Sequence, residues 1–280
     1  MNNNRAVFFF IILTILLTFS SATLFYYFEL DMLSPFLMLI PLITGLFIQK
    51  AVLKRPIFGH SGLGFRLGKK RFLIWAPLFS FLFMVIVYGI SFVLNPSLFS
   101  IDQANTVIQD LVTYKVGSSL LMNILIAALL QLLLAPILNI LIFIGEEVGW
   151  RGFLYPNLVS MYGKKGLIYG GIIWGVWHAP MIYFYDLNFG KNHHLGLVFM
   201  TIFCILAGII LQYVFEKSKS IYSVALMHGM LNISGTFIFY FSVTEEHRYF
   251  IDGGTGIVGL LILLPIAIMC YRRFPVNQKI

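Results

Sequence analysis

Charged residues are scarce in this sequence, and their scarcity excludes an ordinary water-soluble domain. Only 11% of the 280 residues are Asp, Glu, Lys or Arg, whereas 59% are hydrophobic and the mean hydropathy is +0.90. A typical soluble domain has about 25% charged residues. Linkers rich in Pro, Gly or Ser are absent as well. We therefore expect a single integral membrane domain over residues 1–280.

Cysteine is also rare, and the common zinc motifs are missing. Cys204 and Cys270 each lie inside a hydrophobic run, without the spacing of a disulfide framework or a cysteine-rich zinc site. Neither His-Glu-x-x-His nor its reverse occurs. No internal repeat is evident, which weakens the case for a transporter built from inverted halves.

Long apolar runs recur along the chain instead. A run of roughly 20 residues can cross a hydrocarbon core of ~30 Å. The predicted fold is therefore all-α, a polytopic membrane bundle of about eight transmembrane helices. The first run, residues 6–28, is longer than the roughly 7 to 15 residues of a signal-peptide core, so we interpret it as a transmembrane helix. The fourth run, residues 119–150, is longer than one span, and we expect Pro136 to kink it. The predicted spans are 6–28, 33–53, 72–94, 119–150, 166–185, 195–215, 220–243 and 255–271.

Basic and acidic residues are divided unevenly between the predicted loops. Eight spans place both termini on one side, and most of the 19 Lys and Arg residues fall on that side. The other side collects most of the acidic residues. Because Lys and Arg are enriched in cytoplasmic loops, we predict a multi-pass protein of the cell membrane with both termini cytoplasmic. The net charge of +8 thus reports topology, and we expect no nucleic-acid partner. The bilayer is a partner, and the basic loop 54–71 could also bind anionic lipid headgroups.

Few ionisable residues remain inside the spans, and such residues are costly in hydrocarbon. They are Glu146, Glu147, His178 and His228, with Arg151 at a helix end. Intramembrane ionisable groups generally face the bundle interior or a water-filled cavity, where they find partners. The sequence therefore predicts one buried polar site.

Two adjacent glutamates have different neighbours on their helix. Glu147 and Arg151 are four residues apart and share a face, so they can neutralise each other. Glu146 points about 100 degrees away, toward the face shared with Trp150, and we expect it to have no partner within its own helix. Glu146 is thus the carboxylate left for chemistry.

Two other helices carry the remaining polar groups. His178 lies one turn beyond Trp174, and His228 shares a face with Asn232, again four residues apart. A helix rises about 1.5 Å per residue, which places Glu146, His178, His228 and Asn232 at ~12 to ~18 Å from the predicted cytoplasmic ends. We therefore expect one constellation that opens toward the cytosol.

Together these residues resemble the CPBP family of intramembrane proteases. The resemblance rests on Glu-Glu-x-x-x-Arg at 146–151, aromatic-x-x-x-His at 174–178 and His-x-x-x-Asn at 228–232. The family includes the CAAX prenyl endopeptidases and bacterial bacteriocin-processing or self-immunity proteins. It often has Phe where this chain has Trp174. The resemblance implies a catalytic core at about 119–243 and a peptide or protein substrate, prenylated or otherwise associated with the membrane.

The mechanism that we expect is hydrolysis of a peptide bond near the cytoplasmic side. Glu146, assisted by His178, would remove a proton from a bound water. His228 and Asn232 would donate hydrogen bonds to the oxyanion, which is commonly worth ~3 kcal/mol per donor. Glu147, Arg151 and Trp174 would support the site.

Four alternatives remain. Glu146, His178 and His228 could instead bind zinc and leave an open position for water, although Asn232 is a poor zinc ligand and catalysis without a cofactor is favoured. The groups could also form a polar network that only joins helices. A different class of function is a proton-coupled transporter that uses the same buried residues. A third class is a noncatalytic bacteriocin immunity protein.

Overall fold

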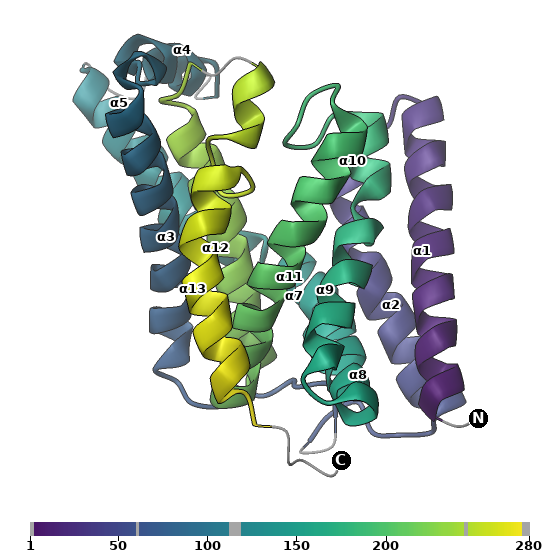
Figure 1. Cartoon of the computed structure of the whole chain (residues 1–280). Helices are drawn as coiled ribbons and strands as arrows, with labels where there is room; N and C mark the ends of the chain where they lie inside the picture. The colour runs from purple at the N-terminus through teal and green to yellow at the C-terminus, as the bar shows by residue number, and fades with distance from the viewer. Residues whose placement is uncertain (1–2, 60–61, 112–118, 244–245, 276–280) are drawn as a thin grey trace.

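The computed structural model describes residues 3–59, 62–111, 119–243 and 246–275, and it is built from helices. No strand occurs among these residues, apart from an isolated bridge between Phe99 and Ser242. The all-α polytopic bundle that the sequence predicts is confirmed. Figure 1 shows the helices standing side by side, roughly parallel to one axis.

Within the described residues, seven helical segments are long and apolar enough to span a membrane. They match the first seven predicted spans. The eighth corresponds to α13, whose 17 residues reach about 26 Å. The segments are α1 (Asn3–Tyr27), η1–α2–η2 (Asp31–Leu39, Ile40–Phe47, Ile48–Val52), α3 (Phe72–Leu94), α5–η4–α6 (Leu120–Ala128, Leu129–Leu134, Ala135–Leu138), α9–α10 (Lys165–Trp177, Ala179–Tyr185), α11 (His193–Ser218), α12 (Ile221–Phe239) and α13 (Ile257–Arg273).

The long run at 119–150 is broken later than the sequence suggests. A π-helical turn, η4, precedes Pro136, but the helix continues through the proline to Leu138. Asn139 then leaves helical geometry, with φ −93° and ψ 10°, and a new helix begins. A break in helical geometry thus lies three residues after Pro136, at Asn139. The remaining elements are η3 (Pro96–Leu98), α4 (Ile101–Leu111), α7 (Ile140–Glu147), η5 (Val148–Leu154), α8 (Tyr155–Tyr162) and η6 (Glu246–Phe250).

Two helix pairs form the centre of the bundle. α11 packs along α9, and α12 packs along α3, while α11 also contacts α12 and α13. The first pair is close because Gly175 has no side chain: a Cβ there would lie 2.5 Å from the Cα of Thr201. Figure 1 accordingly shows α11 between the α3, α12 and α13 side and the α9, α10 and α1 side.

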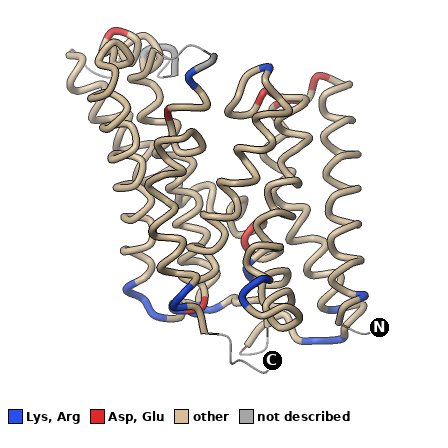
Figure 2. The backbone as a smooth tube through the Cα atoms, in the orientation of Figure 1, with Lys and Arg blue, Asp and Glu red and all other residues tan. Residues whose placement is uncertain are grey.

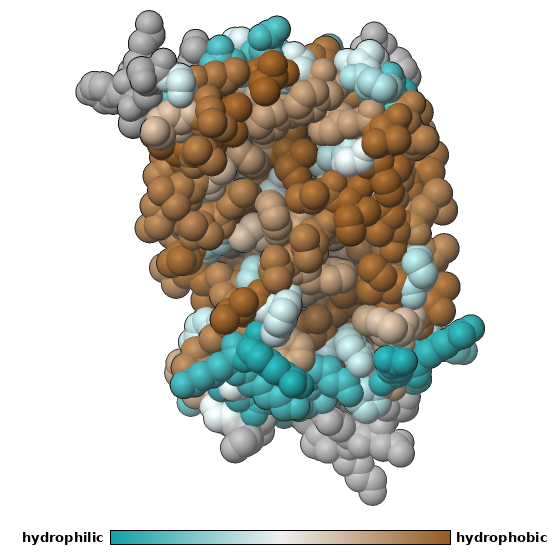
Figure 3. All heavy atoms as spheres, turned by 90° about the vertical axis from the view of Figure 1, so that its left-hand side faces the viewer, coloured by the Kyte–Doolittle hydropathy of each residue, from teal (hydrophilic) through white to brown (hydrophobic). Residues whose placement is uncertain are grey.

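The two ends of the bundle differ in charge. The start of α1 and the end of α13 lie at the end where Lys and Arg gather, as Figures 1 and 2 show. Asp186 and Asp252 belong to loops at the opposite end, which we call the acid-rich end; we call the first the basic end. The face shown in Figure 3 is hydrophobic between these two polar ends. That arrangement suits a chain that crosses a bilayer.

Candidate active site

The two adjacent glutamates lie deep in the bundle, where α7 passes into the π-helical segment η5. Only 1% of Glu146 and none of Glu147 is exposed. Gly149 allows α2 to pack closely against this segment, because a Cβ there would lie 2.3 Å from Cβ of Pro41. Both carboxylates are thus held on well-packed backbone, and each needs hydrogen-bond donors.

Glu146 receives its donors from two tryptophans. Its Oε1 accepts a hydrogen bond from Nε1 of Trp150 at 3.1 Å, and a second from Nε1 of Trp174 on α9. The expectation that Glu146 has no partner within its own helix is therefore wrong. Trp150 lies one turn further on, and its indole reaches back to the carboxylate. Two neutral donors hold Glu146 in place without an ion pair.

Glu147 joins two helices through one oxygen. Its Oε1 accepts from Nη1 of Arg151 and from Nδ1 of His228, each at 2.8 Å. The predicted pair with Arg151 is confirmed, whereas the bond to α12 was not foreseen. The Arg151 guanidinium also lies 4.1 Å from the ring centre of Trp174, in a cation–π contact. Glu147 and Arg151 thus lock the helices together behind the site.

His178 lies at the junction between α9 and α10. Its Nδ1 lies 2.8 Å from the carbonyl oxygen of Trp174. Because a carbonyl can only accept, Nδ1 must carry the proton. In the neutral ring Nε2 is then an acceptor. The ring is further fixed against the indole of Trp177, with the two ring centres 5.0 Å apart.

His228 and Asn232 share a face of α12, as their spacing predicts. The amide nitrogen of Asn232 lies 3.3 Å from Nε2 of His228, and the other ring nitrogen is held by Glu147. The indole of Trp174 meets the His228 ring edge to face, with the ring centres 5.6 Å apart. Trp174 therefore contacts Glu146 of α7, His178 at the end of its own helix and His228 of α12.

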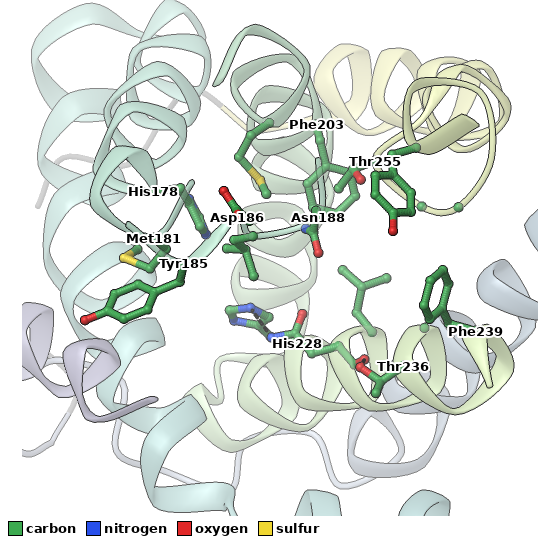
Figure 4. Close-up of a pocket in the computed structure, with 18 of the residues that line it drawn as sticks. His178, Met181, Tyr185, Asp186, Asn188, Phe203, His228, Thr236, Phe239 and Thr255 are labelled. Carbon is green, nitrogen blue, oxygen red and sulfur yellow. Dashed lines mark hydrogen bonds between the residues drawn. The ribbon is translucent and has the colours of Figure 1, made fainter. Parts of the chain in front are cut away.

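A cavity of about 720 Å³ brings the four candidate catalytic residues together. Glu146, His178, His228 and Asn232 all line it, with Glu146 and His228 buried and Asn232 exposed. Figure 4 shows the two histidines facing the same space. The lining does not include Glu147 or Arg151. The two glutamates are thus distinguished by position, since Glu146 faces the cavity and Glu147 lies behind His228.

The cavity leads toward the acid-rich end of the bundle. Its lining extends to residues of that end, and none of its residues comes from the described loops of the basic end. The sequence places the opening at the end that carries the chain termini, whereas the cavity lining reaches the opposite end. Which end faces the cytosol stays a prediction. The rise per residue predicts how deep the four candidate residues lie along the bundle axis, but it does not predict which end of the bundle is closed. The lining residues of the acid-rich end are Ser34, Pro35, Asp186, Leu187, Asn188, Gly190, Tyr249, Asp252, Gly253, Gly254 and Thr255.

Sequence reasoning missed two groups of residues. The first group is the carboxylates of the acid-rich loops, Asp186 and Asp252, because nothing in the sequence distinguishes them from ordinary surface charges. Trp150 did give a signal, since it stands four residues after Glu146 and tryptophan carries a donor. The outer histidine His193 donates to Asp186 at 2.6 Å in an exposed contact.

The zinc site that the sequence allows would consist of Glu146, His178 and His228. In the part of the chain that the structure describes, no three His, Cys, Asp or Glu side chains are grouped so that they could hold a metal ion. Two donor atoms of the proposed set are already engaged: Glu146 Oε1 by two indoles, and Nε2 of His228 by Asn232. The residues do not fit zinc in this arrangement, and we derive no step through a metal.

Part of the chain that carries this site is similar to known proteins. Residues 123–234, which contain all three motifs, match the family described as type II CAAX prenyl endopeptidase Rce1-like. Over these residues the chain is similar to that family. It is also similar to a curated protein, CAAX prenyl protease 2 of Methanococcus maripaludis, with 28% identity over 153 residues. The aligned part is 52% of this chain and 53% of the relative, so the chain spans about half the length of the relative that it matches.

The family match has a definite place in the fold. It begins within α5 and ends within α12. It therefore includes the π-helical segment with the glutamates and both histidine-bearing helices. α1, α3 and α13 lie outside it, as do the loops that carry Asp252 and Thr255. The family resemblance covers the four candidate residues, and the opening of the cavity combines matched and unmatched parts.

Proposed function

We propose that this chain is an intramembrane endopeptidase that hydrolyses a peptide bond inside the cavity. One observation carries the proposal: a carboxylate, two imidazoles and an amide from three helical segments line a single cavity within a hydrophobic bundle. Such groups are expensive in a membrane interior unless they serve a site. The family match to residues 123–234 supports the same activity.

Glu146 and His178 are the proposed water-activating pair. Glu146 accepts a proton from a water molecule, and the hydroxide oxygen attacks the peptide carbonyl carbon. His178 orients that water through Nε2, the ring nitrogen left free by the bond between Nδ1 and the Trp174 carbonyl. The proton on Glu146 then passes to the leaving amine as the carbon–nitrogen bond breaks. The products are a free carboxylate and a free amine.

His228 and Asn232 are the proposed oxyanion donors. Nδ1 of His228 donates to Glu147, so the ring can offer a donor to the cavity only when Nε2 is also protonated. With Nε2 protonated, the amide nitrogen of Asn232, a donor 3.3 Å away, must turn from the ring toward the cavity, because two donors cannot face each other. The amide group of Asn232, exposed to the cavity, supplies the second donor. Glu147 is thus a positioning residue that acts through His228.

The proposed substrate is a membrane-associated peptide or protein. The relative's printed name specifies a CAAX prenyl protease, which makes prenylated peptides one class to test. We further propose that the basic end, which carries the start of α1 and the end of α13, faces the cytoplasm, because Lys and Arg are retained on that side. In that orientation the cavity opens on the other side of the membrane.

The decisive experiment is cleavage of a peptide library by purified protein in lipid nanodiscs. Glu146→Gln, His178→Ala and His228→Ala should each abolish cleavage, and full activity in any of them would overturn the assignment. Glu216→Gln is the matched control, because Glu216 pairs with Lys219 at the basic end, away from the cavity. Cleavage should continue in a zinc chelator; loss that zinc restores would require a metal mechanism.

A further inference from the structure

The cavity wall between the candidate active site and the acid-rich end carries acidic side chains. Three carboxylates line the cavity, those of Glu146, Asp186 and Asp252. Among the described lining residues there is no Lys or Arg. A cleft lined by one sign of charge with low-dielectric walls attracts ligands of the opposite sign. The lining alone therefore favours a cationic group.

Asp252 differs from Asp186 in burial and in its free hydrogen-bonding capacity. The side chain of Asp186 is 51% exposed and already accepts from His193, so solvent screens its charge. Asp252 is only 7% exposed. Its Oδ2 accepts from Nε of Arg248 at 2.8 Å, whereas its buried Oδ1 has no hydrogen-bond partner. Leaving such an oxygen unsatisfied is costly.

The backbone around Asp252 holds its carboxylate in place. The amides of Ile251 and Asp252 both donate to the carbonyl of Arg248, and the amide of Val258 donates to the carbonyl of Ile251. Tyr88 of α3 also packs beside the next residue, Gly253. A buried acceptor on a fixed turn that lines a cavity has the properties of a recognition site.

We propose that the substrate enters from the acid-rich end and that Asp252 is a specificity-determining residue, which binds a Lys or Arg side chain of the substrate peptide. The inference rests on the proposed function and names the substrate class: a peptide with a basic residue on the segment that lies between the cleaved bond and the cavity mouth. The cation donates to Oδ1 once rotation of the side chain turns that buried oxygen toward the cavity, and Arg248 keeps Oδ2. Charge-assisted bonds of this kind are roughly twice as strong as neutral ones.

Binding can be measured without cleavage in the Glu146→Gln background. The probes are two fluorescent hydrophobic peptides that differ at one position, Lys in one and the uncharged norleucine in the other. In nanodiscs of neutral lipid, the lysine peptide should bind about tenfold more tightly, as expected for one charge-assisted hydrogen bond. Asp252→Asn should remove that preference and leave the affinity for the norleucine peptide unchanged. Asp102→Asn is the control, because Asp102 is an exposed acid of α4 at the same end and does not line the cavity.

A second variant separates recognition from folding. Arg248→Gln removes the cation that competes for Asp252, so it should increase the preference for lysine, whereas a purely structural ion pair predicts equal damage from both variants. Equal binding of the two peptides to the protein without the Asp252 change would overturn the inference. That result would leave the proposed function standing, because cleavage is measured separately. Conversely, a lysine preference without any cleavage would support this site and overturn the peptidase.

Discussion

The two ends of the bundle are built in opposite ways. At the basic end, residues 62–71 lie across the turn between α11 and α12 and are bonded to it. Nε of Arg66 donates to the carbonyl of Lys219 at 2.7 Å, and the amide of Lys69 donates to Ser218 at 2.9 Å. Leu63 beneath them is 1% exposed and packs against Gly152. At the acid-rich end, a cavity runs inward instead.

Stability and catalysis are therefore expected to depend on different parts of the bundle, which follow one another along its axis. The basic end satisfies its backbone groups and buries apolar side chains, which is what closes a structure. The acid-rich end keeps polar atoms such as Oδ1 of Asp252 unpaired. Between the two ends, Glu147 and Arg151 form a layer that serves both, since they stabilise the helices and hold His228.

The largest effect on stability is expected in that middle layer. Glu147→Gln leaves Arg151, which has no exposed surface, as a buried charge without its counterion. Breaking such a pair typically costs about 3–5 kcal/mol. Thermal unfolding in detergent should therefore shift strongly downward. Glu216→Gln, which removes a partly exposed partner of Lys219, should cost no more than about 1 kcal/mol. Equal shifts would contradict a special role for the middle layer.

The next effect concerns the open part of the site. Asn232→Ala should lower kcat by about 10²–10³-fold, the usual cost of one oxyanion donor, with little change in KM. Thr236→Val is the matched control, because Thr236 lines the same cavity one turn further along α12. Steady-state kinetics on a cleavable peptide would check this. A larger loss for Thr236→Val than for Asn232→Ala would move the oxyanion site.

The closed end should affect stability and leave chemistry unchanged. Leu63→Ala removes a fully buried side chain, which typically costs about 2–5 kcal/mol. Leu67→Ala changes the same loop at a residue that is 54% exposed, and should cost about 0.5 kcal/mol or less. We expect kcat to be the same in both variants below their melting temperatures. A change in kcat for Leu63→Ala alone would show that the closed end takes part in turnover.

Local rules predicted the parts of this structure that depend on one helix. The apolar runs predicted the spans, and the four-residue spacing predicted the contacts between Glu147 and Arg151 and between His228 and Asn232. A regular helix fixes these neighbours without knowledge of the rest of the chain. The catalytic roles of Glu146, His178, His228 and Asn232 stay predictions.

The missed features depend on contacts between distant segments. The break at Asn139 separates α6 from α7, and the spacing of prolines does not encode it. The opening of the cavity depends on which loop folds back over which end. All three loops are polar in sequence. Residues 62–71 close the basic end, whereas the loops of Asp186 and Asp252 line the cavity at the acid-rich end.

The smallest effect tests the contrast between the ends directly, by placing one cysteine at each. Thr255→Cys lies on the cavity wall at the acid-rich end, and Lys70→Cys lies on the exposed surface of the basic end. The native Cys204 and Cys270 are buried, so a bulky membrane-impermeant maleimide should react mainly with the new thiols. Labelling at 255 should lower turnover by about tenfold or more, because it displaces substrate from its aligned position. Labelling at 70 should leave turnover unchanged, since no substrate passes there, and inhibition from 70 alone would place the entrance at the basic end.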